Sequence, residues 1–182
     1  MKLAIMKWKI NSKKKEVLAL ATGIALLPPL WAVLAPYIKI NTGAVALICA
    51  GLYVTNGNKE QDGLKIMIGF WLGDLWAVLA IFIMEWLKWN QNIELFLTLS
   101  ILGFFAVIIS SLFEKIIFLP AWLCGWAIGL TIMTTESMMN IQGISIQIAA
   151  AMAVGVWYVG AGVDLFTKCI LKRNIKKELK SI

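Results

Sequence analysis

One acidic residue, Asp74, lies in the apolar stretch "WLGDLWAVLA", where an ionised side chain is costly. It falls about ten residues, or roughly 15 Å of helix, into an apolar segment, near the middle of a bilayer. A charge at that depth costs between about 3 and more than 10 kcal/mol, so the carboxyl must be neutral, paired, or turned toward water or other helices. No lysine or arginine lies at comparable depth. A functional site and a structural hydrogen bond to a neighbouring helix are both open interpretations.

The chain offers few other groups for chemistry. It has no histidine, which excludes Ser-His and His-metal chemistry, and it has no glycine-rich phosphate loop or suitably spaced pair of carboxylates. Cys49, Cys124 and Cys169 lie within or at the edge of apolar runs without CxxC spacing, as packing residues do. The sequence therefore predicts that the protein is not an enzyme and has no metal site and no cofactor.

The composition indicates the medium in which the protein folds. Of its 182 residues 60% are hydrophobic, only 15% are charged, and the mean hydropathy is +0.82. Ordinary globular domains are about 45–50% apolar and about 25% charged. A soluble fold of this size could not bury so much apolar surface. We therefore expect an all-α, polytopic membrane helix bundle whose first partner is the lipid bilayer.

Six apolar segments carry this prediction. Four are long enough to cross an apolar core, which needs about 20 helical residues. The second and fifth are shorter, and would cross obliquely or be partly unwound inside a compact bundle. Together they form a predicted transmembrane domain, 16–168, between a basic N-terminus, 1–15, and a basic C-terminus, 169–182. The segments are 16–37, 41–55, 64–87, 92–112, 117–134 and 143–167.

The distribution of basic residues predicts the orientation. If both termini are cytoplasmic, 15 of the 17 lysines and arginines lie on that side, and only Lys39 and Lys88 lie on the other. This bias places both ends inside and requires an even number of spans. The basic ends do not predict nucleic-acid binding, because no aromatic-interleaved platform or recognition fold accompanies them. They fit contact with lipid headgroups.

Two alignments favour an internal repeat. "TGAVALICAGLYV" in the second segment aligns with "PAWLCGWAIGLTI" in the fifth, and "GFWLGDLWAVLA" in the third aligns with "GVWYVGAGVDLF" in the sixth. The second alignment pairs Trp71 with Trp157. Each half, 16–88 and 92–168, would contain three segments, so the halves would have opposite orientations, a 3+3 inverted repeat with short second and fifth helices. Transporters and channels use such repeats, with the binding site between them near the midplane.

Small residues suggest where the halves meet. Gly125 and Gly129 share one face of the fifth helix, and Gly43 and Gly51 nearly share a face of the second. Small faces let helix backbones approach closely. The hypothesis is that the two short helices cross through these glycines near the pseudo-twofold axis; ordinary small-residue packing without symmetry is the alternative.

At this point the sequence resembles a known family. Six segments in about 180 residues, "GLYVTNGNKEQDGLK" after the second segment and "FLPAWLCGWAIGL" at the fifth are similar to the domain of unknown function 1097 family, over roughly residues 17–168. The resemblance implies a small protein of the bacterial cytoplasmic (inner) membrane. It brings no substrate and no catalytic residues.

The leading hypothesis is a transporter or channel subunit for a small solute, assembled as a homo-oligomer, with Asp74 and the four glycines near its pathway. The alternative is a non-transporting membrane partner: a substrate-binding subunit similar to those of energy-coupling-factor transporters, or an assembly or scaffold subunit. The polar run 134–137 after the fifth segment is either a vestibule or an exposed loop. Solute flux through the protein alone would separate the two functions.

Overall fold

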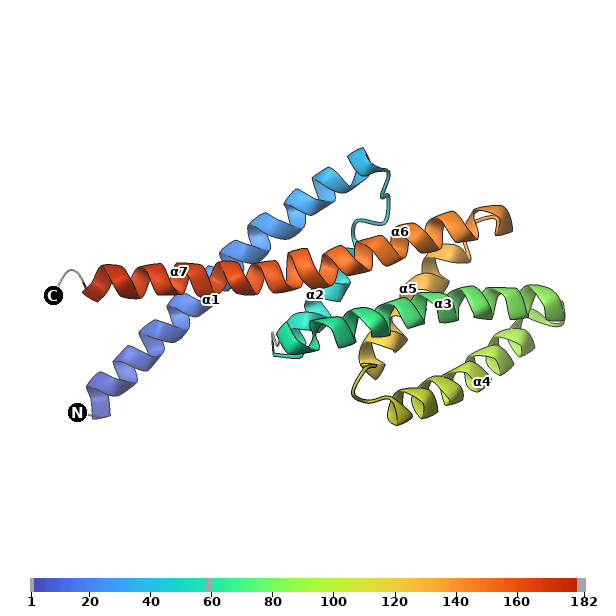
Figure 1. Cartoon of the computed structure of the whole chain (residues 1–182), viewed down its shortest axis with the longest axis horizontal. Helices are drawn as coiled ribbons and strands as arrows, with labels where there is room; N and C mark the ends of the chain where they lie inside the picture. The colour runs from blue at the N-terminus through green and yellow to red at the C-terminus, as the bar shows by residue number, and fades with distance from the viewer. Residues whose placement is uncertain (1, 58–59, 180–182) are drawn as a thin grey trace.

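The computed structural model describes the backbone of residues 2–57 and 60–179, and the side chains of 13–57 and 60–172. Throughout this part the chain is helical and contains no strand (Figure 1), so the all-α prediction is confirmed. Short 3₁₀ turns η1 (Ala35–Ile38), η2 (Glu60–Asp62) and η3 (Met138–Asn140) lie in the connections. The helices are α1 (Lys2–Leu34), α2 (Val45–Thr55), α3 (Gly63–Leu87), α4 (Gln91–Leu112), α5 (Leu119–Met133), α6 (Ile141–Val154), the π-helix η4 (Gly155–Ala161) and α7 (Gly162–Leu179).

These helices match the six predicted segments, because α6, η4 and α7 form one continuous rod (Figure 1). Four stretches are long and apolar enough to cross a membrane: Lys13–Ile38, Glu60–Leu87, Gln91–Leu112 and Met138–Lys172. Helices α2 and α5 are shorter, as expected, with 11 and 15 residues. Both are regular helices, so the short segments are not unwound.

Helix α1 is longer than its predicted apolar segment. It begins at Lys2, inside the predicted basic N-terminus, and continues through Pro28 and Pro29 to Leu34. In an apolar medium a helix keeps most of its backbone bonds internal, which favours continuation past a local loss of donors. Beyond it, η1 turns the chain back, and Trp31 Nε1 donates to the Gly43 carbonyl at 3.2 Å.

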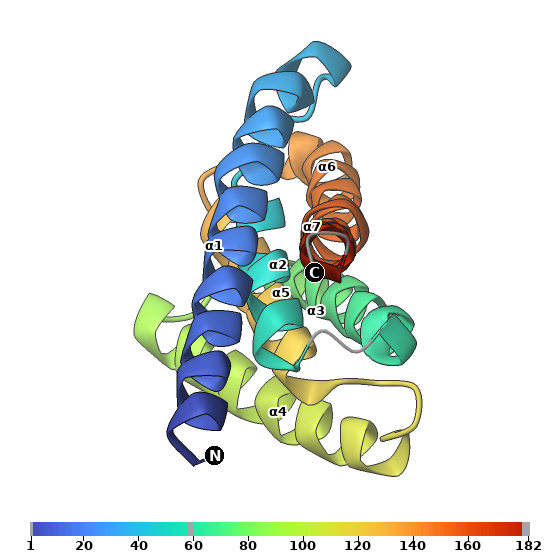
Figure 2. The same cartoon turned by 90° about the vertical axis from the view of Figure 1, so that its left-hand side faces the viewer.

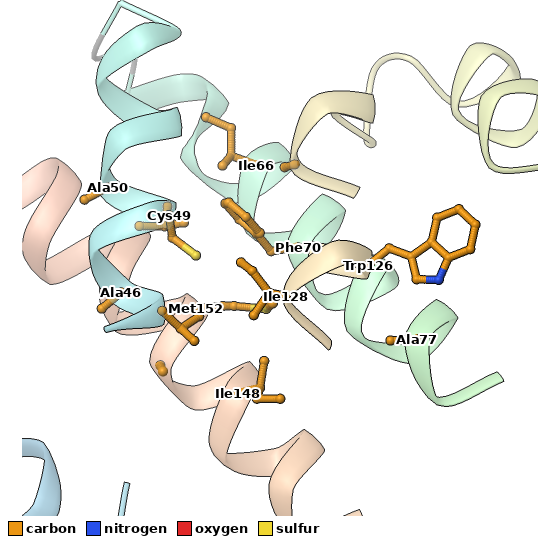
Figure 3. Packing of buried hydrophobic residues seen from close by; sticks show 14 of the residues in the cluster. Ala46, Cys49, Ala50, Ile66, Phe70, Ala77, Trp126, Ile128, Ile148 and Met152 are labelled. Atoms are coloured by element: carbon orange, nitrogen blue, oxygen red, sulfur yellow. The ribbon is translucent and has the colours of Figure 1, made fainter. Parts of the chain in front are cut away.

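The core lies between the two short helices, α2 and α5, and two long helical rods: α3 and the continuous α6–η4–α7. Figure 3 shows Cys49 of α2, Phe70 of α3, Ile128 of α5 and Met152 of α6 pointing toward one another. Helices α1 and α4 lie outside this core, as Figure 2 shows. Only 17% of the apolar stretch of α1 and 22% of that of α4 is buried, against 44% in α3 and 50% in the α6–α7 rod. The two ends of the described chain lie at the same end of the bundle (Figure 1); the opposite end is called the distal end below.

The tightest helix pair is α3 with α5. A Cβ added at Gly73 would overlap the Trp122 carbonyl oxygen, and a Cβ added at Gly125 would overlap the Phe70 carbonyl oxygen. Each backbone therefore lies directly on the other, as in small-residue crossings of membrane helices. Trp76 closes one side of the crossing with an edge-to-face contact to Trp122, with ring centroids 5.1 Å apart.

A second crossing joins α2 to η4. A Cβ added at Gly155 would lie 2.5 Å from the Ala46 carbonyl oxygen, and one added at Gly160 would lie 2.9 Å from the Tyr53 ring. Outside these crossings, α4 contacts α3, and α1 crosses and contacts α7 (Figure 1). Each short helix is thus held against one long rod, and each rod also carries one peripheral helix.

Substitution of the crossing glycines tests this packing. We expect Gly73→Ala and Gly125→Ala to lower the free energy of unfolding by about 1–3 kcal/mol or more, because the added methyl group must push two backbones apart. Gly51→Ala is the matched control, since no atom lies within 4 Å of its added Cβ. Thermal unfolding in detergent measures the difference; equal loss in all three variants would contradict the crossing.

Candidate functional site

Asp74 lies in the interior of the bundle, on the face of α3 that meets α5 and α6. Its side chain is only 2% exposed. Its Oδ2 atom accepts a hydrogen bond of 2.5 Å from the Ser145 hydroxyl of α6. Its Oδ1 atom is buried and has no hydrogen-bond partner among the described residues. The carboxyl group is therefore half satisfied, in a place where an unmet polar atom is costly.

Two of the predicted glycines lie beside this carboxyl. A Cβ added at Gly129 would lie 3.6 Å from Asp74 Oδ1 and would overlap the Ala77 side chain. Gly125, one helical turn earlier on α5, contacts the α3 backbone at Phe70. The absence of side chains at these two positions lets α5 approach α3 closely at the level of the carboxyl.

The other two predicted glycines lie elsewhere. Gly43 precedes α2, and its added Cβ would contact Trp31 of α1 and Ala35 of η1. Gly51 is exposed on α2 with no atom within 4 Å of an added Cβ. The prediction that the short helices cross through these glycines is wrong. The small face of α5 packs on α3, where Gly69 and Gly73 provide the complementary surface.

No opposite charge accompanies Asp74. Helices α5 and α6 contain no acidic or basic residue, and Cys124 is their one ionisable side chain. An ionised carboxylate there would be balanced only by the Ser145 hydroxyl, although buried ions are normally paired. Such a group can take up a proton, or it can bind a cation or a hydrogen-bond donor that enters the bundle.

A polar hollow of about 540 Å³ opens at the distal end of the bundle. Its lining includes Ile144, the neighbour of Ser145 in the chain, and Ile132, which follows Gly129 on α5. The polar side chains around the hollow are three amides, one hydroxyl and one carboxyl group, and they lie beside apolar side chains of isoleucine and methionine; the polar ones are Asn41, Thr42, Glu136, Asn140 and Gln147. The Thr42 hydroxyl oxygen is buried without a described partner. The hollow can therefore offer donors and acceptors to a small polar molecule.

The run 134–137 contributes to this region. Glu136 lines the polar hollow. It also lines a second hollow of about 530 Å³, together with Glu85 and Glu94. The run is exposed, as expected for a loop, and it also borders both hollows, as expected for a vestibule.

The end of the bundle near the termini carries an ion-pair network instead. Lys168 Nζ lies 2.5 Å from Asp164 Oδ2 and 3.3 Å from Glu60 Oε1. The network joins α7 to the connection between α2 and α3. Asp164 thus has a surface partner within its own helix, four residues on, which Asp74 lacks.

Sequence analysis missed two residues of this site. Ser145 is an isolated serine in the sixth segment, 71 residues from Asp74, and no spacing rule connects them. Gly73 could have been identified, because Gly69 and Gly73 are four residues apart in "GFWLGD" and so share a helix face.

Removal of the Ser145 hydroxyl tests the hydrogen bond. We expect Ser145→Ala to lower the free energy of unfolding by about 1–3 kcal/mol, because it leaves Asp74 without its described partner. Ser110→Ala is the control, since that buried hydroxyl bonds only to a carbonyl of its own helix. In a double-mutant cycle the effect of Ser145→Ala should vanish when Asp74 is already alanine. If Ser145→Ala still lowered the free energy of unfolding in the Asp74→Ala background, Ser145 would stabilise the protein by a contact other than the one with Asp74.

Comparison with known proteins adds a family to this geometry. No match was found among curated proteins or among solved structures. The model of one family, described as "Protein of unknown function (DUF1097)", matches residues 21–168, a region that includes part or all of each of the six helical segments and includes Asp74. The chain, an all-helical membrane protein, belongs to the DUF1097 family.

Proposed function

We propose that this protein moves a small solute across the bacterial cytoplasmic membrane without converting it chemically. One observation carries the proposal: a fully buried carboxyl group, Asp74, lies between three helices without an opposite charge, on the helix faces that lead to the hollow of about 530 Å³. Ionisable residues inside a membrane domain commonly mark ion or substrate pathways because they are costly to keep there for structural reasons alone. Asp74, Ser145, Gly125 and Gly129 form the proposed site.

We further propose that the bundle is a 3+3 inverted repeat of residues 16–88 and 92–168. Trp71 Nε1 of α3 donates to the Ala149 carbonyl of α6 at 3.0 Å. Reciprocally, Trp157 packs over Gly63 of α3, where an added Cβ would lie 3.0 Å from its ring. The offset of 86 residues that pairs Trp71 with Trp157 also pairs Gly63 with Ala149. The two contacts are thus related by the proposed symmetry.

The helix neighbours support the same symmetry. The short helix α5 of the second half crosses α3 of the first, and the short helix α2 of the first half crosses η4 of the second. Likewise α4 contacts α3, and α1 contacts α7. Each relation becomes the other when the halves are exchanged. Since α2 and α5 each pack mainly on the rod of the other half, the interface between repeats is the core of the protein.

The structure changes the register of the short helices. Gly69 lies on Ala121, with an added Cβ 2.9 Å from its side chain, and Gly155 lies on Ala46. The structurally equivalent positions of α2 and α5 are therefore Ala46 and Ala121, 75 residues apart. The alignment of the two stretches by sequence uses 78. A shift of three residues explains why Gly51 does not occupy the place of Gly129.

The proposed repeat is symmetric in packing and asymmetric in chemistry. The offset that pairs the two tryptophans sets Asp74 opposite Gly160, which packs on the Tyr53 ring. Only the first rod therefore carries a carboxyl group at this level. With the polar hollow at the distal end and the Lys168 network at the other, the arrangement supports a pathway accessible from the distal side.

Reporter fusions test the membrane orientation. We expect a fluorescent reporter that folds only in the cytoplasm to be active when fused to the C-terminus, because the basic residues favour that side. A periplasmic phosphatase inserted in the 134–137 connection should be active, and the same phosphatase at the C-terminus should be silent. Reversed activities would overturn the orientation.

Flux through the purified protein tests transport. Proteoliposomes are loaded with a panel of small polar and cationic solutes, and uptake is followed with time. We expect uptake of at least one solute, and we expect Asp74→Asn to reduce it by about tenfold or more while the protein stays folded. Asp164→Asn is the matched control, because it also replaces a buried aspartate by asparagine, but on α7 and outside the proposed site.

The outcomes separate the functional classes. Equal flux in wild type and Asp74→Asn would remove Asp74 from the pathway. Absence of flux for every solute, together with co-purification of an ATPase, would favour the alternative of a non-transporting membrane partner. Size measurement of the protein in nanodiscs at the same time shows whether a homo-oligomer is the active form.

A further inference from the structure

We infer that Asp74 and Ser145 form a proton-exchange site, so that transport is coupled to protons; the coupling rests on the proposed function, whereas the proton site itself does not. The inference starts from the position of the carboxyl group. Asp74 is 2% exposed, Oδ2 accepts the Ser145 hydroxyl at 2.5 Å, and Oδ1 has no partner among the described residues. A proton on this group removes the charge that the surroundings do not balance.

The titratable groups around Asp74 are few. On α3 itself the nearest are Lys65 and Glu85, nine and eleven residues away along the helix. The packed helices α5 and α6 contribute only Cys124. On the more distant elements, Cys49 and Tyr53 belong to α2 and Tyr158 to η4, and Glu94 of α4 accepts the backbone N–H of Trp89. None of these is paired with Asp74 in a hydrogen bond or ion pair in the described part of the chain.

The available ligands favour a proton over a metal ion. Hard metal cations take about six oxygen ligands or more. Here the side chains bring together two carboxylate oxygens and one hydroxyl oxygen, and α3, α5 and α6 keep regular helical backbones at this level. A proton needs only one oxygen. The serine hydroxyl suits both states, because it donates to the carboxylate and can accept from the carboxylic acid.

The second hollow, of about 530 Å³, lies over the same helix faces as the site and provides the route for exchange. Its lining includes Ile81, seven residues beyond Asp74 on α3, Ile141, four residues before Ser145 on α6, and Met133, four residues beyond Gly129 on α5. Residues four or seven apart share a helix face, so this hollow and the carboxyl group lie on the same side of these three helices. Water that fills the hollow would therefore approach the carboxyl group from the distal side.

Carbodiimide labelling tests the proton site directly, without a transport assay. Dicyclohexylcarbodiimide reacts with protonated carboxyl groups in apolar surroundings. The acid adds across one C=N bond, its proton moves to nitrogen, and the acyl group then shifts from oxygen to nitrogen as a stable N-acylurea with no leaving group. The full-length protein in nanodiscs is labelled across a pH series in potassium buffer, digested, and analysed by peptide mass spectrometry.

We expect labelling of Asp74 that falls about tenfold per pH unit above its midpoint. Asp74→Asn should lose the label, and Ser145→Ala, which leaves the carboxyl group in place, should keep it. Asp164, beside Lys168, is the internal control and should stay unlabelled. Absence of label on Asp74 at every pH would overturn the inference, as would protection by sodium at constant pH, which would indicate a metal-ion site.

The two proposals fail separately. If Asp74 is labelled and no solute moves, the proton site stands and the transport function fails. If solute moves and Asp74 is never labelled, the transport function stands and the proton site fails. If both hold, a proton gradient across the proteoliposome should raise uptake several-fold in the wild type, and equal uptake with and without the gradient would overturn the coupling.

Discussion

The contact between the backbones of α3 and α5 determines most of this structure. Gly73 and Gly125 lack side chains where each helix meets a carbonyl group of the other, so the two helices approach as closely as backbones can. In a membrane no water-driven collapse presses helices together, and close packing of small surfaces takes over that role. The short helix α5 is held in the middle of the bundle by this contact. The positions of the Trp76–Trp122 pair and of the α5–α6 connection follow from it.

The same contact creates the surroundings of Asp74. Because α5 lies so close to α3, only glycine fits at position 129 beside the carboxyl. An alanine there would already overlap Ala77. One carboxyl oxygen meets the Ser145 hydroxyl of α6. The other oxygen keeps its hydrogen-bonding capacity. A buried acid with one satisfied and one free oxygen is costly in structural terms and useful in chemical terms, because it can exist in two protonation states with little rearrangement.

In the proposed repeat, the two halves use the same kind of helix crossing around different residues. In each, a short helix lies on the rod of the other half through a glycine: Gly69 under Ala121 and Gly155 under Ala46. The second rod contains a π-helical turn, η4, at its crossing. Such turns insert a residue into a helix and often occur at functional positions. In the proposed repeat this turn corresponds to the stretch of α3 that contains Asp74, so the proposed halves differ at the level of the proposed site.

The sequence by itself determined the medium, the helical class, the six segments, the short second and fifth helices and the family, because these depend on composition and on the length of apolar runs. It also singled out Asp74, since a carboxyl in such a run is conspicuous without any structure. Only the tertiary structure decided which small faces meet. Gly51 and Gly129 look alike in the sequence, yet Gly51 is exposed on α2 and Gly129 lies against Ala77 and Asp74, because the two short helices pack on different partner helices. Ser145 belongs to the site for the same reason: its distance from Asp74 is set by how α3, α5 and α6 cross, which no local pattern records.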